Sequence, residues 1–295
     1  MKKVLVIGDL ILDEYLYVES KRFAQEASVP IFDVVKRDVR FGGAANVWAN
    51  IASIGDGLIK VDLLGIKNPE WYAPREFVDS EIFTKKTRVV LDGKIVARID
   101  HSDEPNRLDL LDEMIDIICY RIHKYDAIVI SDYKKGLLDE ENIMKIMHET
   151  RDHDVSVFVD SKAMDLSPYE GAEFLSINEN EYSTQVSNKS YRNVESLFGS
   201  VVVTMGVKGA LLRRHVANDR NAYAVSVTHI PTTQVQEVDV TGCGDVHLAA
   251  FVVAKMNGMV DDDAVHYANK AAGVAVTRFG TTVVKRWDFL TDSDC

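Results

Sequence analysis

Asp239-Val-Thr-Gly-Cys-Gly-Asp245, followed at once by an apolar run from Val246 to Met256, is the stretch around which this chain is organised. Its two inner glycines flank one small residue, so the backbone can turn sharply and aim several N–H groups at one point. The apolar run predicts a helix, whose N-terminus favours a bound anion such as a phosphoryl group. Asp245 lies in the first turn of that helix, where its carboxylate can accept a proton. An anion site beside a carboxylate favours phosphoryl transfer to a hydroxyl, although the local pattern fits a plain strand-to-helix turn equally well.

The composition is that of a globular protein, with 46% hydrophobic and 27% charged residues in a chain of 295. This length predicts one large domain over residues 1–295, or a domain with an appendage. A net charge of −12 argues against non-specific binding to nucleic acid or to an anionic membrane. No apolar run approaches the roughly 20 residues that a membrane span needs. Met1-Lys-Lys leads directly into a predicted strand, and three widely spaced cysteines form no disulfide or zinc pattern, so a cytoplasmic location is expected.

Apolar runs typical of buried strands alternate with amphipathic segments typical of helices. The predicted strands are 3–8, 126–131, 155–160, 174–177 and 200–204, and the predicted helices include 42–55, 108–123 and 140–151. Regular βα alternation of this kind predicts an α/β fold, with a mostly parallel central sheet and helices on both of its faces.

Two segments rich in strand-forming residues interrupt the alternation, at approximately 13–40 and 82–101. Pro30 suits an edge strand, and Asp92-Gly93 predicts a hairpin turn. We expect the two segments to form a small accessory sheet inserted in the α/β core, which could act as a lid that excludes water.

Polar side chains recur where the predicted strands end: Asp9, Asp132, Asp160, Lys162, Asn178, Glu181 and Thr204. In a parallel sheet these ends meet at one edge, which is where ligands bind. Asp9 and Asp13 could accept hydrogen bonds from sugar hydroxyls, although each could equally cap a turn. Glu181 could suffice as the protein ligand of Mg²⁺, because this ion usually needs only one or two protein carboxylates.

Glycines and basic residues provide further candidates. Gly42 and Gly43 open a predicted helix with Asn46 in its first turn, which permits close approach of the backbone to a ligand or tight packing on the sheet. Basic residues lie at 85–88, with Arg98 across the predicted hairpin. A solvated charged face explains the lysines equally well, whereas a bidentate arginine is the better candidate for binding a substrate phosphate.

The chain resembles the ribokinase-like (PfkB) carbohydrate kinase family over essentially its whole length. Four motifs in the family's order carry the resemblance: GG…N at Gly42, Gly43 and Asn46, NxxE at Asn178 to Glu181, VTxGxxG at Val203 to Gly209, and DxTGxGD at Asp239 to Asp245. Within the family, stretches such as GDLILDEYLYVESKR, FGGAANVWANIASIG and SDYKKG are most similar to the heptose-7-phosphate kinases of lipopolysaccharide-core synthesis. Cys243 replaces a commoner Ala, which is a sterically mild departure.

The resemblance implies a ribokinase-like fold and Mg²⁺-assisted transfer from ATP to the anomeric hydroxyl of a sugar that already carries a 7-phosphate. It implies Asp245 as general base and the N–H groups of Gly242, Cys243 and Gly244 as the anion hole. The implied nucleotide-site residues are Asn178, Glu181 (also near the metal), Thr204, Gly206, Gly209, Asn269 and Gly273. The expected substrate residues are Asp9, Asp13, Gly42, Gly43, Asn46, Arg88, Arg98, Asp132 and Lys162. A homodimer formed through the lid is also implied.

Three alternatives stay open at this point. One is a kinase of the same fold that acts on fructose, ribose or a nucleoside, for which a basic cluster in the lid would be unnecessary. Another is a catalytically silent scaffold with a retained kinase fold. The third is a nicotinamide dehydrogenase, which is disfavoured because Gly8 is followed by Asp9 and Leu10 rather than by a G-x-G-x-x-G turn.

Overall fold

The computed structural model describes residues 1–67, 78–79, 84–102, 109–187, 194–216 and 224–290. It contains an eight-stranded sheet of order β14-β13-β12-β11-β10-β9-β1-β4, a four-stranded sheet of order β3-β2-β7-β8, and the short pair β5 (Ile66–Lys67) and β6 (Val78–Asp79). The predicted α/β class, with a mostly parallel sheet and a smaller sheet beside it, is confirmed.

The eight-stranded sheet is parallel except at one edge. The parallel strands are β1 (Lys2–Gly8), β4 (Ile59–Leu64), β9 (Ala127–Asp132), β10 (Ser156–Ser161), β11 (Phe174–Asn178) and β12 (Ser200–Thr204), and the antiparallel ones are β13 (Ala210–Val216) and β14 (Ala224–Ile230). The run of apolar residues in β1 has a simple cause: Val4 and Val6 pack into the core on one face, and Leu5 and Ile7 pack into the core on the other.

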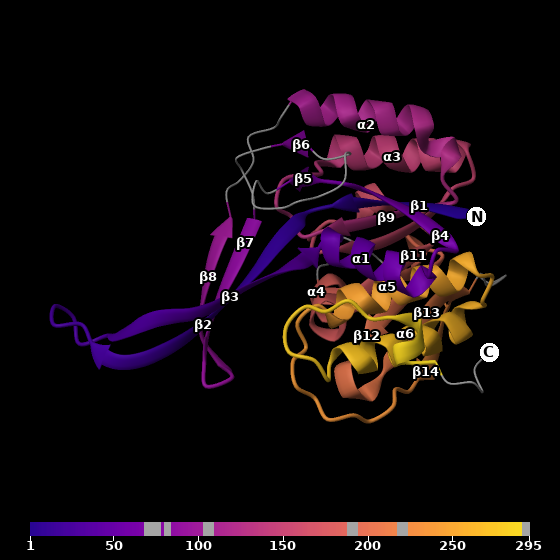
Figure 1. Cartoon of the computed structure of the whole chain (residues 1–295). Helices are drawn as coiled ribbons and strands as arrows, with labels where there is room; N and C mark the ends of the chain where they lie inside the picture. Colours follow the sequence, from indigo (N-terminus) through magenta and orange to yellow (C-terminus); the bar gives the residue numbers. More distant parts are fainter. Residues whose placement is uncertain (68–77, 80–83, 103–108, 188–193, 217–223, 291–295) are drawn as a thin grey trace.

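Helices cover both faces of this sheet (Figure 1). One face is covered by α1 (Ala44–Gly55), α5 (Cys243–Met256) and α6 (Asp261–Ala275), and the other by α2 (Asp109–Arg121), α3 (Glu140–Asp152) and α4 (Glu179–Ser187). Short 3₁₀ turns occupy Ile122–Lys124, Ser167–Tyr169, Val194–Ser196, Gly206–Lys208 and Arg286–Asp288. No helix in the described ranges is long and apolar enough to cross a membrane.

The second sheet projects from the body at the carboxyl end of β1 (Figure 1). Its strands are β2 (Leu10–Phe23), β3 (Pro30–Gly43), β7 (Thr84–Leu91) and β8 (Lys94–Ser102). Only Asp9 separates β1 from β2, so one continuous stretch of chain contributes a strand to each of the two sheets. Pro30 begins an edge strand, and positive φ angles at Asp92 and Gly93 close the predicted hairpin.

The first helix begins later than the sequence predicts. The helix predicted from Gly42 begins at Ala44 instead, because Gly42 and Gly43 complete β3 through pairing with Ile11 and Leu10. Residues 82 and 83 of the second β-rich segment lie outside the described residues.

Candidate active site

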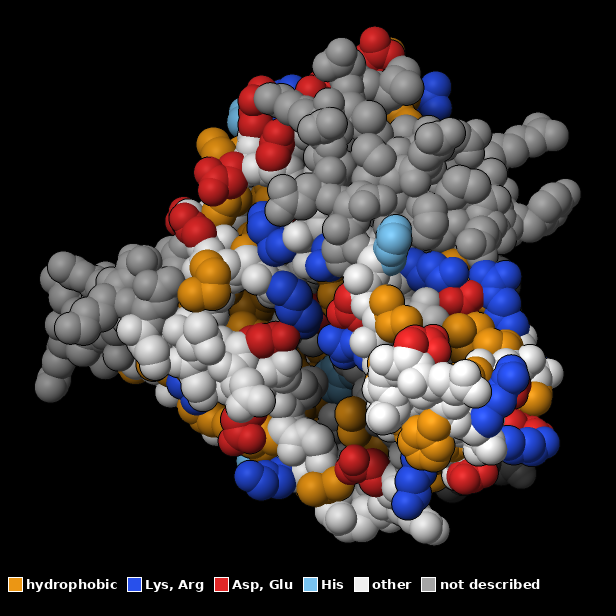
Figure 2. Space-filling view, turned by 90° about the vertical axis from the view of Figure 1, so that its left-hand side faces the viewer, with side chains coloured by type: hydrophobic (Ala, Val, Ile, Leu, Met, Phe, Trp, Pro, Cys, Tyr) orange, Lys and Arg blue, Asp and Glu red, His pale blue; other side chains and the backbone are white. Residues whose placement is uncertain are grey.

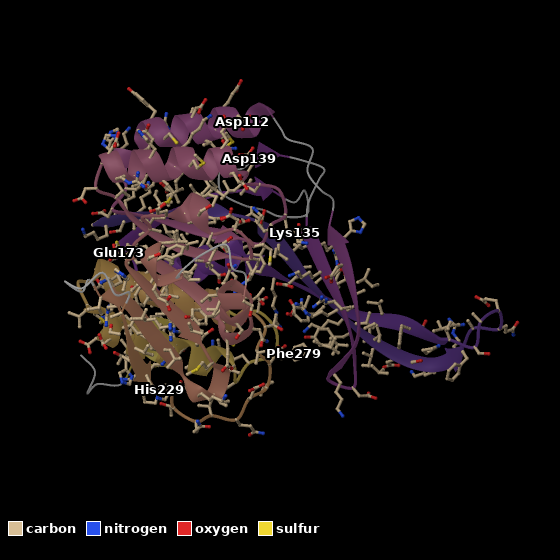
Figure 3. All side chains as sticks on the ribbon, turned by 180° about the vertical axis from the view of Figure 1, so that it is seen from behind. Asp112, Lys135, Asp139, Glu173, His229 and Phe279 are labelled. Carbon is tan, nitrogen blue, oxygen red and sulfur yellow. The ribbon has the colours of Figure 1, made fainter. Side chains whose placement is uncertain are left out.

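The predicted site residues gather where the carboxyl ends of the parallel strands face the second sheet. Figure 3 shows Lys135, from the loop after β9, and Phe279, from the loop after α6, on the edge of the body nearest that sheet. In the space-filling view, Lys and Arg side chains surround a hollow on this side of the molecule, mixed with acidic ones (Figure 2).

The Asp239–Asp245 turn is held from within by the first of its carboxylates. Asp239 Oδ1 accepts hydrogen bonds from the N–H and hydroxyl of Thr241 at 2.9 and 2.7 Å. Its Oδ2 accepts from the N–H of Gly280 at 2.9 Å. Asp239 therefore fixes the turn to the loop after α6. Its role within the motif is structural.

Gly242 is the N-cap of α5, with a left-handed φ of 77°. A Cβ at this position would lie 2.8 Å from Nδ2 of Asn46 and 3.0 Å from Cγ2 of Thr281, so only glycine fits. No side chain caps the helix, which leaves its N-terminal dipole facing the cleft. The N–H of Cys243 donates to the carbonyl of Val240 at 3.2 Å, so this member of the predicted anion hole also closes the turn.

The Cys243 thiol is free and part-buried in the turn. Burial, with Asp239 and Asp245 nearby, raises the pKa of Cys243 to about 12. The thiol therefore stays protonated at neutral pH, and the side chain serves to fill the turn.

Asp245 is buried, and each of its carboxylate oxygens holds a donor. Asn46 Nδ2 donates to Oδ2 at 2.9 Å, and Tyr133 Oη donates to Oδ1 at 2.8 Å. Burial raises the pKa of Asp245 to about 7, and the charge of Asp160 acts in the same direction, while the two donors oppose the rise. A carboxylate with this pKa can exchange a proton at neutral pH, as a general base requires.

Asp9 and Asp132 organise the loop that follows β9. Asp9 Oδ2 accepts from the N–H groups of Tyr133 and Lys135 at 2.7 and 3.1 Å, and burial raises the pKa of Asp9 to about 6. Asp132 Oδ2 accepts from the hydroxyl of Tyr169 at 2.6 Å. Two further donors, the hydroxyl of Ser161 and the N–H of Lys134, lie 2.9 and 2.8 Å from Asp132. With these acceptors filled, Asp132 is placed to order the loop rather than to face a ligand.

The cleft-facing side of the second sheet carries Asp13, Lys86, Arg88 and Arg98. Asp13 and Arg88 form a buried ion pair, and a Cβ on Gly42 would lie 2.2 Å from Asp13 Oδ2. Arg98, directly opposite Arg88 in the hairpin, is more exposed and pairs with Asp100 at 2.8 Å. The two arginines expected to bind a substrate phosphate thus each have a carboxylate partner within the protein.

Lys86 differs from its neighbours. Within the described ranges it forms no ion pair, and its Nζ lies 5.4 Å from the ring centroid of Tyr133. Burial lowers its pKa, an effect that the charge of Asp13 opposes. Lys85, one residue earlier, points to the other side of the sheet and pairs with Glu14 at 3.0 Å. Lys86 is therefore a part-buried cation directed at the cleft.

Asn178 and Glu181 cap the start of α4 reciprocally. Glu181 Oε2 accepts from the N–H of Asn178 at 3.0 Å, and Asn178 Oδ1 accepts from the N–H of Glu181 at 2.9 Å. Lys162 Nζ lies 2.9 Å from carboxylate oxygens of both Glu181 and Asp160. Although burial opposes the change, these two carboxylates raise the pKa of Lys162.

The donor set around Glu181 fits a magnesium ion held mainly by phosphates and water. Glu181 offers a part-exposed carboxylate. Lys162, which pairs with it, also pairs with the more buried carboxylate of Asp160. No group of three or more metal-ligating side chains occurs in the part of the chain that the structure describes. Mg²⁺ keeps several waters and takes one or two protein carboxylates. The part-exposed Glu181 could supply one of them through the lone pairs that Lys162 and the N–H of Asn178 do not use.

The remaining predicted nucleotide residues lie at the end of β12, in the turn that follows it, and on α6. Thr204 ends β12 beside Asn178, and Gly206 and Gly209 shape the turn into β13. Asn269 on α6 donates to the carbonyls of Ile230 and Pro231 at 3.1 and 3.3 Å. Gly209 packs against the same two residues, and Gly273 leaves an open surface one turn beyond Asn269. The turn, the end of β14 and α6 are thus brought together.

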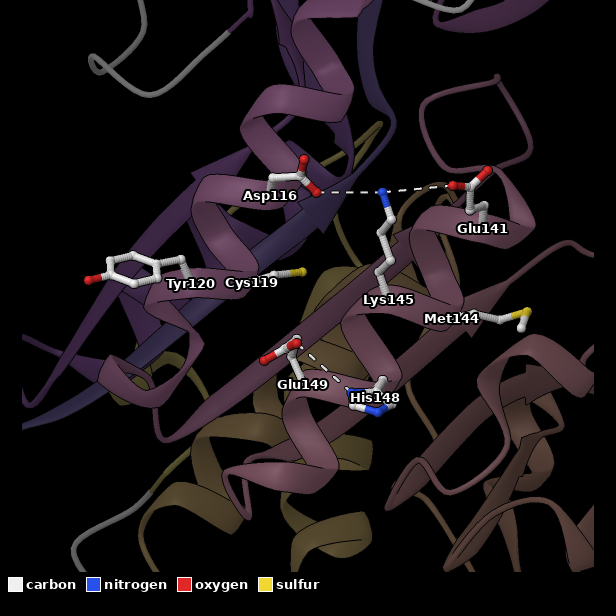
Figure 4. Close-up of a pocket in the computed structure, with 8 residues that line it drawn as sticks. All are labelled: Asp116, Cys119, Tyr120, Glu141, Met144, Lys145, His148 and Glu149. Atoms are coloured by element: carbon white, nitrogen blue, oxygen red, sulfur yellow. Dashed lines mark hydrogen bonds and ion pairs between the residues drawn. The ribbon is translucent and has the colours of Figure 1, made fainter.

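A separate groove of about 680 Å³ lies between α2 and α3 (Figure 4). Lys145 on α3 pairs across the groove with Asp116 on α2 at 3.5 Å, and with Glu141 on its own helix at 3.8 Å. Its one thiol, Cys119, has its pKa raised to about 11 by burial and so supplies no nucleophile. The groove adds no chemistry to the candidate site.

Two residues of the site escaped prediction from sequence, Tyr133 and Asn50, whereas Lys86 was predicted only as one of the basic residues at 85–88. Tyr133 follows Asp132 at a strand end, a position that the strand-end pattern could have included. Asn50, one turn after Asn46, donates to Asn46 and to Thr282 at 2.9 and 3.1 Å, and thereby ties α1 to the loop beside Gly242. Only the folded arrangement reveals that contact.

A buried carboxylate of raised pKa lies beside an uncapped helix N-terminus, at the carboxyl ends of parallel strands, an arrangement that suits phosphoryl transfer. A model of the pfkB family carbohydrate kinases matches residues 78–287, and the chain belongs to this family. It is accordingly a phosphotransferase that acts on a sugar hydroxyl. The resemblance expected from four motifs is confirmed.

The chain is also similar in sequence to curated proteins named HldE. The chain is 30% identical to the bifunctional protein HldE of Trichlorobacter lovleyi, over 96% of this chain and 61% of that protein. It is 32% identical to HldE of Pelobacter propionicus, over 95% of this chain and 61% of that protein. The chain thus spans somewhat less than two thirds of the length of these relatives.

Solved structures show the same fold. Ribokinase from Thermotoga maritima matches with a TM-score of 0.70 at 20% identity, over 98% of both chains. Phosphofructokinase-2 from Escherichia coli, in complex with substrates and products, matches with a TM-score of 0.71 at 15% identity, over 98% of this chain and 97% of that one. The ribokinase-like fold predicted from the sequence is confirmed.

Proposed function

We propose that this protein transfers the γ-phosphoryl group of ATP to the anomeric hydroxyl of a heptose 7-phosphate, in a pathway that makes ADP-heptose for lipopolysaccharide. The observation that carries the kinase chemistry is Asp245, buried at the N-terminus of α5 with a pKa of about 7. Similarity to the HldE proteins over almost the whole of this chain supports a heptose rather than another sugar.

The proposed mechanism is a direct in-line transfer without a covalent enzyme intermediate. Asp245 orients the acceptor hydroxyl and takes its proton as the bond to phosphorus forms, so the oxygen attacks as an alkoxide-like group and ADP leaves. The N-terminus of α5 stabilises negative charge on the transferring phosphoryl oxygens. Glu181, together with Asn178, would hold Mg²⁺, which supplies charge neutralisation at the phosphates.

Sugar binding is assigned to the wall formed by β1, β2 and α1. Asp9, Asp13 and Asn46 lie on this wall, and the ion pair between Asp13 and Arg88 holds Asp13 in place. Truncating Arg88 would leave Asp13 buried and unpaired, so an Arg88→Ala variant would not isolate a substrate contact. We assign the substrate phosphate to Lys86 instead, because it is a part-buried cation that faces the cleft and, unlike Lys162, forms no ion pair within the described ranges.

Lys86→Met is expected to raise KM for the sugar phosphate by about ten- to a hundredfold, since a charge-assisted contact to an anion is lost. KM for ATP should stay close to that of the unaltered protein. Steady-state kinetics with each substrate varied in turn measure both effects. Lys85→Met is the matched control, because Lys85 pairs with Glu14 on the opposite side of the sheet. Equal increases in the two KM values for Lys86→Met would contradict the assignment.

Assembly and location follow as further proposals. Exposed apolar side chains on the second sheet include Val34, Val35 and Ile99. Their burial between two copies would support a homodimer formed through this sheet, which would then act as a lid over each site. Sedimentation velocity at micromolar protein measures the assembly state. A cytoplasmic location is consistent with ATP as the donor.

The experiment that tests the proposed substrate is a panel of sugars and sugar phosphates in an ADP-release assay with ATP and Mg²⁺. A heptose 7-phosphate should give the highest kcat/KM, and the corresponding free heptose a much lower one. Preference for free fructose, ribose or a nucleoside would identify a different kinase of the same fold. Absence of ADP release with every acceptor would favour a silent scaffold.

A further inference from the structure

Tyr133 joins the two carboxylates at the centre of the site. Its backbone N–H donates to Asp9 Oδ2 at 2.7 Å, while its hydroxyl donates to Asp245 Oδ1 at 2.8 Å. The residue follows β9 directly, so its backbone is fixed by the sheet and its side chain crosses to the start of α5. A phenol held at both ends in this way can fix the orientation of the carboxylate that it contacts.

Two lysines from different parts of the fold flank the ring of Tyr133. Nζ of Lys86, on β7 of the second sheet, lies 5.4 Å from the ring centroid, and Nζ of Lys162, after β10, lies 5.5 Å from it. A cation over an aromatic face draws electron density from the ring, which makes a phenol O–H a stronger hydrogen-bond donor. The two lysines thus favour donation from the Tyr133 hydroxyl, whereas burial and the charges of Asp245, Asp160 and Asp13 raise its pKa.

We propose that Tyr133 is a positioning residue for Asp245: its hydroxyl fixes Oδ1 and stabilises the ionised carboxylate, which leaves the free lone pairs directed at the acceptor hydroxyl. This inference rests on the proposed role of Asp245 as general base. On this view Tyr133 and Asn46 together hold the Asp245 carboxylate, each through a hydrogen bond to one of its oxygens.

The electrostatics of the site explain why such a donor is needed. Burial and the neighbouring Asp160 both favour the protonated form of Asp245, whereas Asn46, Tyr133 and Lys162 favour the ionised form. The charged groups that act on Tyr133 itself are Asp245, Asp160 and Asp13, with Lys86 and Lys162 over its ring. Removing the Tyr133 hydroxyl therefore shifts the balance toward protonated Asp245, and the base then works only at higher pH.

Tyr133→Phe is expected to move the acid limb of the pH profile of kcat/KM for the sugar phosphate upward by about one pH unit. Replacing Tyr133 with 3-fluorotyrosine, whose phenol is more acidic but similar in shape, should move the same limb downward. KM for ATP should change little in either variant. These opposite shifts are not expected from a purely structural role, and the fluorinated variant keeps the test usable even if the Phe variant folds poorly.

Tyr125→Phe is the matched control. Tyr125 stands just before β9, at the other end of the same strand, and its hydroxyl donates to Asp62 Oδ2 at 3.1 Å, away from the site. This variant also loses a hydroxyl-to-carboxylate hydrogen bond, but its acid limb should stay where it is in the unaltered protein. An acid limb that stays in place in both Tyr133 variants would overturn the inference.

The test separates failure of this inference from failure of the proposed function. Asp245→Asn, assayed in parallel, tests the base itself. If that variant turns over at close to the normal rate, the base assignment fails and the inference about Tyr133 fails with it. If Asp245→Asn is inactive while the acid limb of the Tyr133 variants does not move, only the role of Tyr133 is overturned.

Discussion

Asp245→Asn is expected to lower kcat by about 10²–10⁴-fold, because general-base catalysis typically contributes that much and the amide cannot accept the proton. ATP affinity should remain nearly unchanged, since Asp245 faces the acceptor and the change is isosteric. Single-turnover rates and equilibrium ATP binding measure the two quantities separately. A variant with nearly normal turnover would remove Asp245 from the base role.

Although Asp245→Asn should lower kcat, it should stabilise the folded protein at neutral and higher pH. The pKa of Asp245 is raised on folding from 3.8 to about 7, so the folded state holds the proton more tightly than the unfolded state does. The resulting destabilisation is complete above about pH 7 and shrinks as the pH falls toward 3.8. Its upper bound is about 4 kcal/mol at roughly 1.4 kcal/mol per pKa unit. Asp245→Asn should therefore raise Tm at pH 8 and raise it less at pH 5, which a pair of thermal melts will show.

Gly242→Ala is expected to lower kcat by about 10²–10³-fold, the loss typical of a damaged anion hole. The new Cβ would lie 2.8 Å from Nδ2 of Asn46 and 3.0 Å from Cγ2 of Thr281, so the turn must move. Because Asn46 also donates to Asp245, the displacement reaches the base. The rate of phosphoryl transfer under saturating substrates measures the effect.

Gly258→Ala provides the control at the other end of α5. Gly258 has a φ of 83°, close to the 77° of Gly242, but no atom lies within 4 Å of its added Cβ. Both substitutions should carry the penalty of a left-handed alanine, about 1–2 kcal/mol. Only Gly242→Ala should lose activity. Comparable losses of kcat in the two variants would mean that general destabilisation, not the anion hole, explains the result.

The fold could be predicted from sequence because its signals are local. Continuous apolar runs such as Val4–Ile7 identify strands buried on both faces, and alternation of these strands with amphipathic segments specifies a parallel sheet. The Asp92-Gly93 turn and Pro30 likewise identified the hairpin and edge strand of the second sheet. The start of α1 was misplaced by two residues, since pairing of Gly42 and Gly43 with β2 outweighs the helical pattern.

The partners of the charged residues could not be predicted in the same way. A run of four residues containing Lys85, Lys86 and Arg88 does not indicate which cation is neutralised within the protein. The register between β2 and β7 places Lys86, not Arg88, directly opposite Asp13. The tertiary packing decides the ion pair, because the Arg88 side chain reaches diagonally to Asp13 while Lys86 Nζ lies over the ring of Tyr133. The two strands are separated by about 60 residues of chain, and no local pattern encodes their alignment.

By itself the sequence determined the family, the fold and the turn from Asp239 to Asp245, since glycine spacing and hydrophobic periodicity act over a few residues. Tertiary structure alone decided the state of Asp245. Its burial, and its contacts with Asn46 and Tyr133 across 199 and 112 residues of chain, bring its pKa to about 7. Desolvation and hydrogen bonding depend on what surrounds a group in space, and that is fixed only when distant segments pack together.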